Sequence, residues 1–483
     1  MKLTLQPSHL PGRAFDRQVP IFNIYYPFQW DAKSGDVFVD GVTALSQIDF
    51  SSVSSVALYF HFPFCETICN FCPFTRGKYQ GHQIISDYLE AIIKEINLKS
   101  EQKNLRELAV RSIFVGGGTP SLLTADEIRQ FGTALHEHFD LSLLREFAFE
   151  CEVKSVTADK VAALREIGVT NARYGLQTFD PFWRDMFDLT ASLDQIQAAN
   201  ELFNKMLPYS SFDILYGMNG QTTDAFLADL EKAAAMGNAL VDVYPIDNVV
   251  TQIKLHRKLE AAGFTSKTAD ERFDMNRLLR AVMREHGFLP HNGHGYVRVD
   301  ADELARNPAV TDTYTFDYHD HIYGHADTAV VGFGVNAISI LPQTVLTNTG
   351  NRRKYIDDMH ENGSVKTQIS RHDRSIDASR PVVTRLAYHG VLEKNRVFWN
   401  EVPRECIQAL HEFADAGLIR DAGDTWRITQ DGWEWYVNMM YYAMPESQKS
   451  VLDAFIIHCL RQPGRVLTAD QIEFVNSGHL AIA

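Results

Sequence analysis

Hydrophobic runs and amphipathic stretches alternate along residues 53–270 of this 483-residue chain. Each run predicts a short strand, and the stretches between them carry apolar residues at three- and four-residue spacing, which predicts helices. Six strands alternating with helices imply parallel pairing through right-handed crossovers. Because six units fall short of a closed eight-unit barrel, we predict an α/β fold built on a partial (β/α)6 barrel. The predicted strands are VALYFHF (56–62), VRSIFVGG (110–117), EFAFECE (146–152), NARYGLQ (171–177), SSFDILYG (210–217) and LVDVYPI (240–246).

The pattern changes outside this barrel. Residues 23–31 read NIYYPFQWD, aromatic and without a clear period, which is typical of a packed arm. Residues 404–437 predict a helix, a hairpin and a second helix, as in a small winged-helix unit within a C-terminal α+β domain. The division that we expect is an N-terminal arm (1–52), the barrel (53–270), a substrate-covering region (271–380), a winged-helix-like unit (381–445) and a C-terminal helix with a tail (446–483).

Composition and charge narrow the class of protein. Apolar residues make up 45% of the chain and the formal net charge is −15, without a long run of Lys or Arg. A nucleic-acid partner is therefore not expected. A membrane partner is not expected either, because no stretch reaches the roughly 18 apolar residues of a membrane span. Six cysteines in so long a chain do not suggest a disulfide framework. We expect a monomeric, cytoplasmic protein that acts on a small molecule.

Three of the six cysteines fall within the segment CETICNFC (65–72), directly after the first predicted strand. Catalytic groups of parallel α/β folds gather at the carboxyl ends of the strands, and Cys65 lies at such an end. Three thiolates at this spacing can hold an iron–sulfur cube and leave a fourth iron without a protein ligand. A structural zinc normally takes four protein ligands, and no CxxC partner lies nearby. Cys151, Cys406 and Cys459 are expected to be buried structural residues.

The segment YFHFPFCETICNFC resembles the radical S-adenosylmethionine (SAM) superfamily, and more narrowly its HemN-like branch. That branch contains the oxygen-independent coproporphyrinogen III dehydrogenases and their relatives. The resemblance runs from about residue 55 to about residue 440, and its specificity comes from the order and spacing of several motifs. The other matching segments are FVGGGTPSLL, FECEVKS, YGLQTFD, FDILYGMNGQT and VGFGVNAIS.

This resemblance implies a [4Fe–4S] cluster held by Cys65, Cys69 and Cys72, with SAM chelating the open iron. One electron, from a flavodoxin- or ferredoxin-type donor, would then cleave SAM to a 5′-deoxyadenosyl radical. The branch also implies a second SAM molecule, with Gly118 and Thr119 beside it. The residues expected to contact the cluster or SAM are Tyr59, Phe71, Gly116, Gly117, Gly118, Thr119, Glu150, Gln177 and Asp213.

Several positions depart from the pattern of the porphyrin enzymes. Pro73 and Phe74 replace the Gly-Cys pair that follows the third cysteine in true coproporphyrinogen dehydrogenases. Leu189 stands about where the family carries an Arg, and Asn219 replaces a Pro. The segment YHDHIYGHAD takes the place of an R-H-N-x-x-Y-W motif. A site for a tetracarboxylate porphyrinogen would also favour several Arg contacts.

These departures favour the class C methylases and cyclopropanases of the HemN-like branch. We therefore expect transfer of a methyl or methylene group from the second SAM to an sp² carbon of a natural product. Two alternatives stay open. One is oxidative decarboxylation of coproporphyrinogen III or another tetrapyrrole reaction, and the other is a non-catalytic heme chaperone.

The expected transfer requires a general base after radical addition, and the His- and Tyr-rich region after the barrel supplies candidates. We assign this role to His319, Tyr296 or Tyr318. The alternatives for the histidines of this region are a second metal site or hydrogen bonds to the substrate. These histidines are His291, His294, His319, His321 and His325.

Overall fold

The computed structural model describes residues 3–5, 13–30, 38–79, 81–246, 249–265, 267–313 and 316–477. Parts of the predicted N-terminal arm, and residues 478–483 of the predicted C-terminal tail, lie outside the described residues. No helix within the described ranges is long and apolar enough to cross a membrane.

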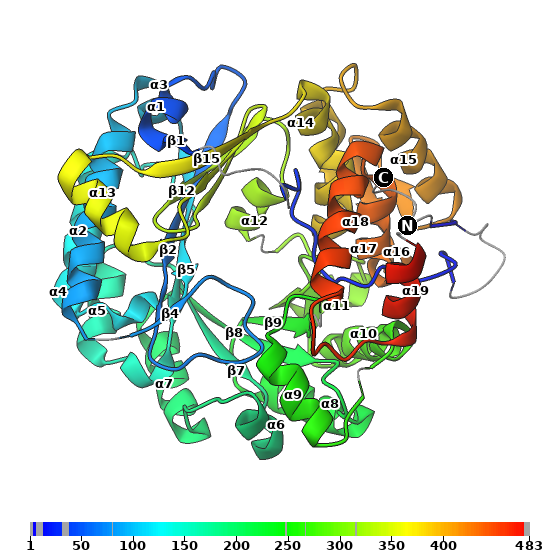
Figure 1. The fold of residues 1–483 in the computed structure, drawn as a ribbon. Coiled ribbons are helices and arrows are strands. Elements are labelled where there is room, and N and C mark those ends of the chain that lie inside the picture. Colours follow the sequence, from blue (N-terminus) through cyan, green and yellow to red (C-terminus); the bar gives the residue numbers. More distant parts are fainter. Residues whose placement is uncertain are drawn as a thin grey trace.

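Six parallel strands follow one another around a curved sheet in the order in which they occur in the chain (Figure 1). Each matches its predicted run to within one residue at either end, so the predicted partial barrel is confirmed. The strands are β2 (Ser55–Phe62), β5 (Val110–Gly117), β6 (Glu146–Cys151), β7 (Asn171–Gln177), β8 (Tyr209–Tyr216) and β9 (Leu240–Pro245). The helices between them are α2 (Gln83–Ser100), α3 (Lys103–Arg106), α4 (Ala125–His138), α5 (Ala158–Glu166), α6 (Pro181–Met186), α7 (Leu193–Met206) and α8 (Thr223–Ala235).

Local sequence signals fix where several of these helices begin. Thr124 caps α4 together with Glu127, and Ser192 caps α7 together with Gln195. In each pair the hydroxyl accepts from the backbone of the later residue, whose side chain accepts from the capping backbone in return. The same arrangement starts α10 (Ala269–Glu285). These caps end the preceding loops at defined residues, so the strand ends that face the loops are also fixed.

The sheet extends beyond the six predicted strands. On one side β12 (Thr328–Phe333) adds a seventh parallel strand next to β2, from a segment far along the chain. The described sheet has 13 strands in the order β1-β15-β14-β13-β12-β2-β5-β6-β7-β8-β9-β11-β10. Its antiparallel members are β1 (Phe38–Asp40), β10 (Phe288–Pro290), β11 (Gly295–Arg298), β13 (Ile338–Leu341), β14 (Thr344–Asn348) and β15 (Lys366–Arg371). The domain boundaries at residues 52, 270, 380 and 445 stay a prediction.

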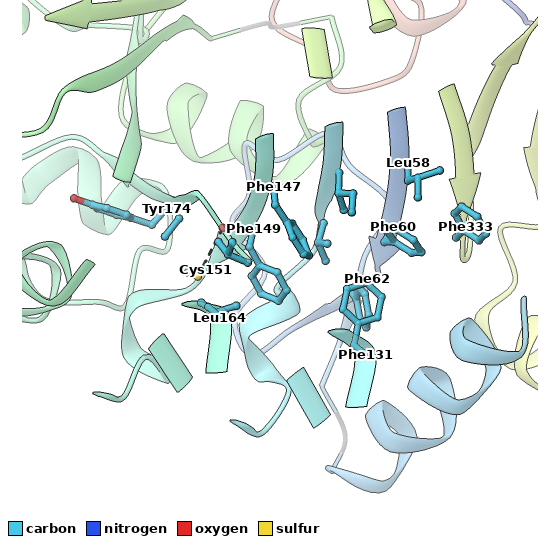
Figure 2. Packing of buried hydrophobic residues seen from close by; sticks show 14 of the residues in the cluster. Leu58, Phe60, Phe62, Phe131, Phe147, Phe149, Cys151, Leu164, Tyr174 and Phe333 are labelled. Atoms are coloured by element: carbon cyan, nitrogen blue, oxygen red, sulfur yellow. Dashed lines mark hydrogen bonds between the residues drawn. The ribbon is translucent and has the colours of Figure 1, made fainter. Parts of the chain in front are cut away.

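Alternation along the strands separates two faces of the sheet. In β2, Leu58 and Phe60 point to the helices, and Tyr59 between them points to the opposite face. Figure 2 shows the helix-side core, where Phe60 stacks on Phe333 at 4.6 Å between ring centroids. Phe131 of α4 meets Phe60 edge-on at 5.0 Å. Burial of each such side chain stabilises the fold by about 1.5–3 kcal/mol, which holds the strands in one register.

The C-terminal region packs around a second core. The predicted helix–hairpin–helix pattern is present as α15 (Arg404–Asp415), the hairpin β17 (Ile419–Asp421) and β18 (Thr425–Ile428), α16 (Gln430–Glu434) and α17 (Tyr436–Ala443). β16 (Val391–Glu393) completes a three-stranded sheet after the π-helix η3 (Pro381–His389). Two helices follow where one was predicted, α18 (Glu446–Leu460) and α19 (Ala469–Ser477). Part of the N-terminal arm runs alongside them (Figure 1), and Tyr26 of this arm is fully buried in the second core.

The remaining described elements are short or lie between the two cores. They are α1 (Gly41–Ser46), β3 (Phe64–Cys65), β4 (Gly77–Lys78), α9 (Ile253–Ala261), α11 (Ala301–Arg306), α12 (Asp317–Ile322), α13 (Arg352–Asn362), α14 (Arg374–Arg380) and the 3-10 turns at Pro120–Leu122, Val153–Ser155 and Lys394–Arg396.

Candidate functional site

The six central strands share an accessible inner face. Away from strand ends, and apart from Arg111 near the start of β5, each strand is buried except at one position. Tyr59 pairs with Phe114 and Gly175 pairs with Asp213, and the other neighbours are offset by two residues, which keeps them on the same face. All six lie on the side away from the helices, so they border one space at the centre of the sheet. These positions, the inner face below, are Tyr59, Phe114, Glu150, Gly175, Asp213 and Tyr244.

The cysteine loop begins where β2 ends and is fixed by hydrogen bonds to its backbone. The amide of Tyr79 donates to the carbonyl of Cys65 at 2.8 Å, and the amide of Cys72 donates to the carbonyl of Cys69 at 3.3 Å. Gln252, just before α9, donates its side-chain amide to the Cys69 carbonyl at 3.0 Å. The loop is therefore held by hydrogen bonds within its own segment and by Gln252, which follows the last barrel strand.

Asn70 anchors the middle of the cysteine loop. It is fully buried, and its amide donates to the carbonyl of Met186 at 2.8 Å and to Asp188 Oδ2 at 3.1 Å. Lys254 and Lys258 of α9 bind the same Asp188 carboxylate at 2.6 and 2.7 Å. Sequence reasoning did not identify this contact, because its partners lie more than a hundred residues from the loop.

The three cysteines form a donor set that fits an iron–sulfur cluster. All are free, half-buried thiols on one loop. Burial raises the pKa of Cys65 to about 11 and that of Cys69 to about 12. Coordination would reverse this shift, because a metal deprotonates a coordinating thiol outright. Among the described residues, no group of three His, Cys, Asp or Glu side chains is arranged to hold a single metal ion.

The glycine-rich end of β5 brings its backbone against Glu150. The amide of Gly117 donates to Glu150 Oε2 at 2.8 Å, and burial raises the pKa of Glu150. Gly117 has φ +104°, and a Cβ there would lie 2.3 Å from the ring of His61. Only glycine fits this left-handed position without displacing the ring. The His61 ring also hydrogen-bonds to the hydroxyl of Tyr59 at 2.8 Å. Tyr59, His61, Gly117 and Glu150 therefore lie in one connected set of contacts.

Gly116 and Gly118 are equally confined. A Cβ on Gly116 would lie 2.6 Å from Glu150 Oε2, and one on Gly118 would lie 2.5 Å from the carbonyl of Phe62. Thr119 follows them, is nearly buried and hydrogen-bonds to the Cys65 thiol, which opposes the rise in its pKa. The strand end and the cysteine loop therefore meet at the predicted cofactor position.

Asp213 and Gln177 lie on the next strands of the same face. The Asp213 side chain is 36% exposed, yet burial raises its pKa to about 8 although Arg173 lies 3.8 Å away. Arg173 instead donates a hydrogen bond to Asp242 Oδ2 at 2.8 Å. Gln177 has φ +72° at the end of β7, a costly conformation for a residue other than glycine. Its buried Oε1 has no hydrogen-bond partner among the described residues, so Gln177 is strained and polar at the site.

Two aromatic residues predicted for the site, Tyr318 and Phe71, lie in different parts of it. Tyr318 of α12 stacks on Phe114 at 4.7 Å and on Tyr59 at 5.9 Å, which puts it on the inner face. Phe71 instead packs edge-on against Phe187 at 5.0 Å, beside the cysteine loop.

His319 follows Tyr318 on α12. Its ring packs against Phe316, Tyr323 and Tyr388, at 4.2, 5.4 and 5.4 Å between ring centroids. Burial lowers its pKa well below the ordinary value, and its Nδ1 has no hydrogen-bond partner in the described part of the chain. His319 is therefore a neutral imidazole among aromatic rings.

The structure does not bring Tyr296 to this site. Tyr296 pairs with Val241 across the β11–β9 ladder, and paired residues of an antiparallel ladder point to the same face. Val241 belongs to the helix-side core, and Tyr296 is itself 1% exposed there. The register of β11 turns the side chain of Tyr296 away from the inner face, so the structure does not bring this predicted catalytic residue together with Tyr318.

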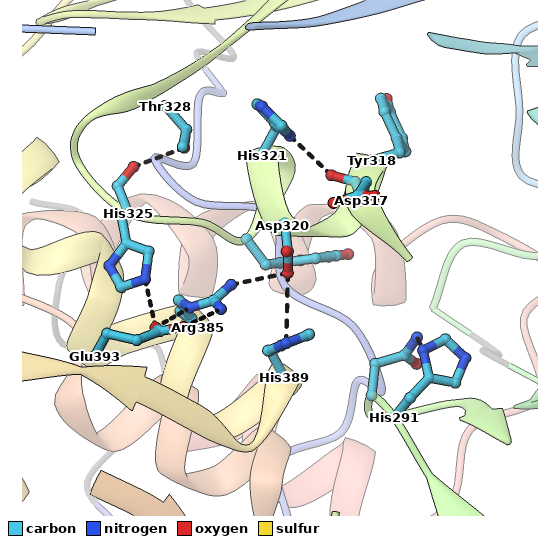
Figure 3. Close-up of polar contacts among 12 residues, drawn as sticks. His291, Asp317, Tyr318, Asp320, His321, His325, Thr328, Arg385, His389 and Glu393 are labelled. Carbon is cyan, nitrogen blue, oxygen red and sulfur yellow. Dashed lines mark hydrogen bonds and ion pairs between the residues drawn. The ribbon is translucent and has the colours of Figure 1, made fainter. Parts of the chain in front are cut away.

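The other histidines also belong to different contacts (Figure 3). His321 binds the Ser55 hydroxyl at 3.0 Å and the Asp317 carbonyl at 2.8 Å. His325 binds Glu393 at 2.7 Å. Burial lowers the pKa of His291 and of His294 to about 3. The described histidines thus take part in separate polar contacts and form no common ligand set.

Comparison with known proteins shows which proteins this chain is similar to. The pattern of the Radical SAM superfamily matches residues 59–233. An oxygen-independent coproporphyrinogen III oxidase from Pseudomonas aeruginosa is 24% identical over 399 residues, which cover 78% of this chain and 83% of the relative. Heme chaperone HemW from Lactococcus lactis is 28% identical over 234 residues, covering 48% of this chain and 59% of the chaperone. The solved structure of coproporphyrinogen III oxidase (HemN) from Escherichia coli superposes with a TM-score of 0.67 at 20% identity, covering 83% of this chain and 92% of that one.

These matches show a Radical SAM domain at residues 59–233. The longer matches are to the HemN-like branch, which the motifs around the cysteine loop also resemble. The radical SAM family uses a [4Fe–4S] cluster and SAM. The expectation of two SAM molecules, the type of electron donor and the monomeric state stay predictions.

The expected methyl or methylene transfer to a natural product is wrong. The relatives include coproporphyrinogen III oxidases and heme chaperones, and the oxidases match over most of their length. The departures at Pro73, Phe74 and Leu189 are therefore no evidence for a methylase. A general base for that transfer is no longer required.

Proposed function

We propose that this chain is a radical SAM oxidoreductase that acts on a tetrapyrrole, by oxidative decarboxylation of coproporphyrinogen III or a close analogue. The observation that carries the proposal is the extended likeness to coproporphyrinogen III oxidases, which covers 78% of this chain in sequence and 83% in structure. The HemW match covers only 48% of the chain, so it supports the chaperone alternative less.

The proposed reaction converts a propionate side chain into a vinyl group. The propionate loses one hydrogen atom from the carbon next to the ring, then CO₂ and one electron, and the electron passes to a one-electron acceptor. When bound, the cluster and SAM supply the carbon radical that takes the hydrogen atom. Decarboxylation consumes no base, which agrees with a neutral His319 whose pKa is lowered by burial.

The residues of this chain bind and orient in this proposal. Cys65, Cys69 and Cys72 would hold the cluster, and Glu150 and Asp213 would face the positive charges of SAM. Stacked Tyr59, Phe114 and Tyr318 form an apolar wall of the same space, which excludes water from a reactive radical. In this proposal the acidic residues bind the cofactor and the aromatic wall shields the same space.

An anaerobic turnover assay tests this proposal. Reconstituted protein, SAM, reductant, a one-electron acceptor and coproporphyrinogen III should give 5′-deoxyadenosine and CO₂ in equal amounts, with loss of 44 mass units and two hydrogens per vinyl group formed, about 46 in all. Cys69→Ala should abolish both products, whereas Cys459→Ala, a buried cysteine of the second core, should retain them.

Other outcomes would redirect the assignment. Formation of 5′-deoxyadenosine without CO₂ would contradict decarboxylation and point to another tetrapyrrole reaction. Stoichiometric retention of heme without SAM cleavage would contradict an enzyme and support the chaperone alternative.

A further inference from the structure

Arg76 is a cation that lies directly beside the cysteine loop. It precedes β4, whose Lys78 pairs with Cys65 in the two-stranded β3–β4 ladder. The guanidinium Nη1 of Arg76 donates to the carbonyl of Phe74, two residues after Cys72. The side chain is therefore folded back over the loop that carries the third cysteine.

The guanidinium is incompletely satisfied by the protein. The Nε–H of Arg76 is buried and has no hydrogen-bond partner in the described part of the chain. A buried N–H without an acceptor is unfavourable, which indicates that a bound group accepts from it. The Phe74 carbonyl that Arg76 binds lies two residues after Cys72, so the charge of Arg76 lies beside the segment that carries the predicted cluster ligands.

We propose that Arg76 is a positioning residue for the cluster, and that its charge raises the reduction potential by stabilising the reduced form. The inference rests on the assignment of the cluster to Cys65, Cys69 and Cys72. A cluster with three thiolate ligands gains a further negative charge on reduction, and net charge and hydrogen bonds to sulfur are among the factors that set such potentials. A half-buried guanidinium whose buried Nε–H has no partner among the described residues can supply both.

The surroundings make Arg76 distinctive among nearby cations. Lys78 is exposed to solvent, where its charge is screened. Arg352 lies with its guanidinium 4.8 Å from the centre of the Phe64 ring, so part of its charge is engaged in a cation–π contact. The chain as a whole carries a net charge of −15, which disfavours adding an electron to an anionic cluster. Arg76 offsets that background at the one place where the electron arrives.

Potentiometric titration of the reconstituted protein, followed by electron paramagnetic resonance without substrate, tests the proposal. Arg76→Gln should shift the midpoint potential to a more negative value. Lys78→Gln removes the same charge from an exposed position two residues later, in β4, and should leave the midpoint close to that of the wild type. Arg76→Lys keeps the charge without the fixed fork of donors and should lie between.

Iron and sulfide are quantified first for each variant. If Arg76→Gln holds a full cluster and its midpoint moves no further than that of Lys78→Gln, the proposal is overturned. If Arg76→Gln loses the cluster, Arg76→Lys is expected to restore it, and equal loss in both variants overturns the proposal. The potential is read without any tetrapyrrole, so this result is independent of whether coproporphyrinogen III is the substrate.

Discussion

Asp213 carries a carboxyl group whose ionisation the fold makes unfavourable at neutral pH. Burial raises its pKa to about 8, and the Arg173 guanidinium that would lower it is shared with Asp242. SAM is cationic and favours the ionised carboxylate. Binding of SAM and release of the Asp213 proton are therefore linked, and part of the binding free energy below pH 8 is consumed by ionisation.

We predict that the affinity for SAM weakens as the pH falls from about 8.5 to about 6.5, by up to about tenfold per pH unit. Asp213→Asn should bind SAM more weakly at the upper pH and lose most of this pH dependence. Equilibrium dialysis on the cluster-loaded protein measures both quantities. Asp224→Asn, at an exposed carboxyl on α8, is the control for net charge. Parallel pH profiles for wild type and Asp213→Asn would exclude Asp213 as the linked group.

Asn70 makes a second prediction at the scale of one residue. Its buried amide is the direct side-chain link from the cysteine loop to Asp188, so Asn70→Ala should release the loop from α9. We expect a loss of about 1–3 kcal/mol in the free energy of unfolding, toward the lower end because Lys258 also donates to the Met186 carbonyl at 3.2 Å.

The loosened loop should also lose iron faster to a chelator. Thermal unfolding of the metal-free protein and the rate of iron release measure these two effects. Asn362→Ala, at an exposed position at the end of α13, is the matched control. Iron release from Asn70→Ala at the rate of this control would show that the anchor does not protect the cluster.

At the scale of elements, the contact between α12 and η3 depends on a buried ionic network (Figure 3). Arg385 of η3 donates to Asp320 of α12 at 2.9 Å and to the two carboxylate oxygens of Glu393 at 3.0 Å each. The Arg385 side chain is only 4% exposed, whereas the two carboxylates that it binds are half-buried. The network ties the helix that borders the inner face to the C-terminal unit.

Removal of this arginine should therefore be costly. We predict that Arg385→Met lowers the free energy of unfolding by about 3 kcal/mol, because it leaves two half-buried carboxylates with only His389 and His325 as partners. Chemical denaturation of the metal-free protein measures the change. Arg374→Met, which breaks the exposed pair with Glu401, should cost about 0–1 kcal/mol. Equal costs for the two variants would mean that the α12–η3 contact does not depend on this charge.

The strands and helices themselves were easier to predict from the sequence than which strands pair with one another. The six barrel strands follow from local alternation of apolar residues, which burial on the helix side enforces. The position of β12 beside β2 could not be predicted, because strand pairing across more than 250 residues leaves no local pattern. The same limit applies to Tyr296, whose orientation depends on the register of β11 against β9.

The candidate site shows the same division. Cys65, Cys69 and Cys72 were legible because their spacing is itself the signal for a cluster. Asn70 and Gln252 were not, since a buried amide and a glutamine carry no pattern until their partners are known. The departures at Pro73 and Leu189 were legible but misjudged, because a changed residue shows a lost contact and does not indicate the new reaction.

At the scale of the whole molecule, two hydrophobic cores divide the chain in a way that does not follow its order. One core lies between the barrel sheet and its helices. The other joins part of the N-terminal arm to the C-terminal helices, although about 350 residues separate them in the chain, as the Tyr26 hydroxyl bonded to Ser379 at 2.6 Å illustrates. Because few core residues are shared, local stability can differ between the two.

Adjacent tyrosines of the arm allow this division to be tested. Tyr26 is 0% exposed in the second core, whereas Tyr25 is 46% exposed and stacks on Tyr323 at 6.0 Å. We predict that Tyr26→Ala destabilises the second core by about 3–5 kcal/mol, and that Tyr25→Ala changes stability by about 1 kcal/mol or less. Hydrogen exchange should show faster opening of residues 381–389 and 436–443 in Tyr26→Ala, with the barrel strands protected as in the wild type. Equal loss of protection in β2 through β9 would mean that the two cores unfold as one, and the arm would then stabilise the barrel as much as the C-terminal unit.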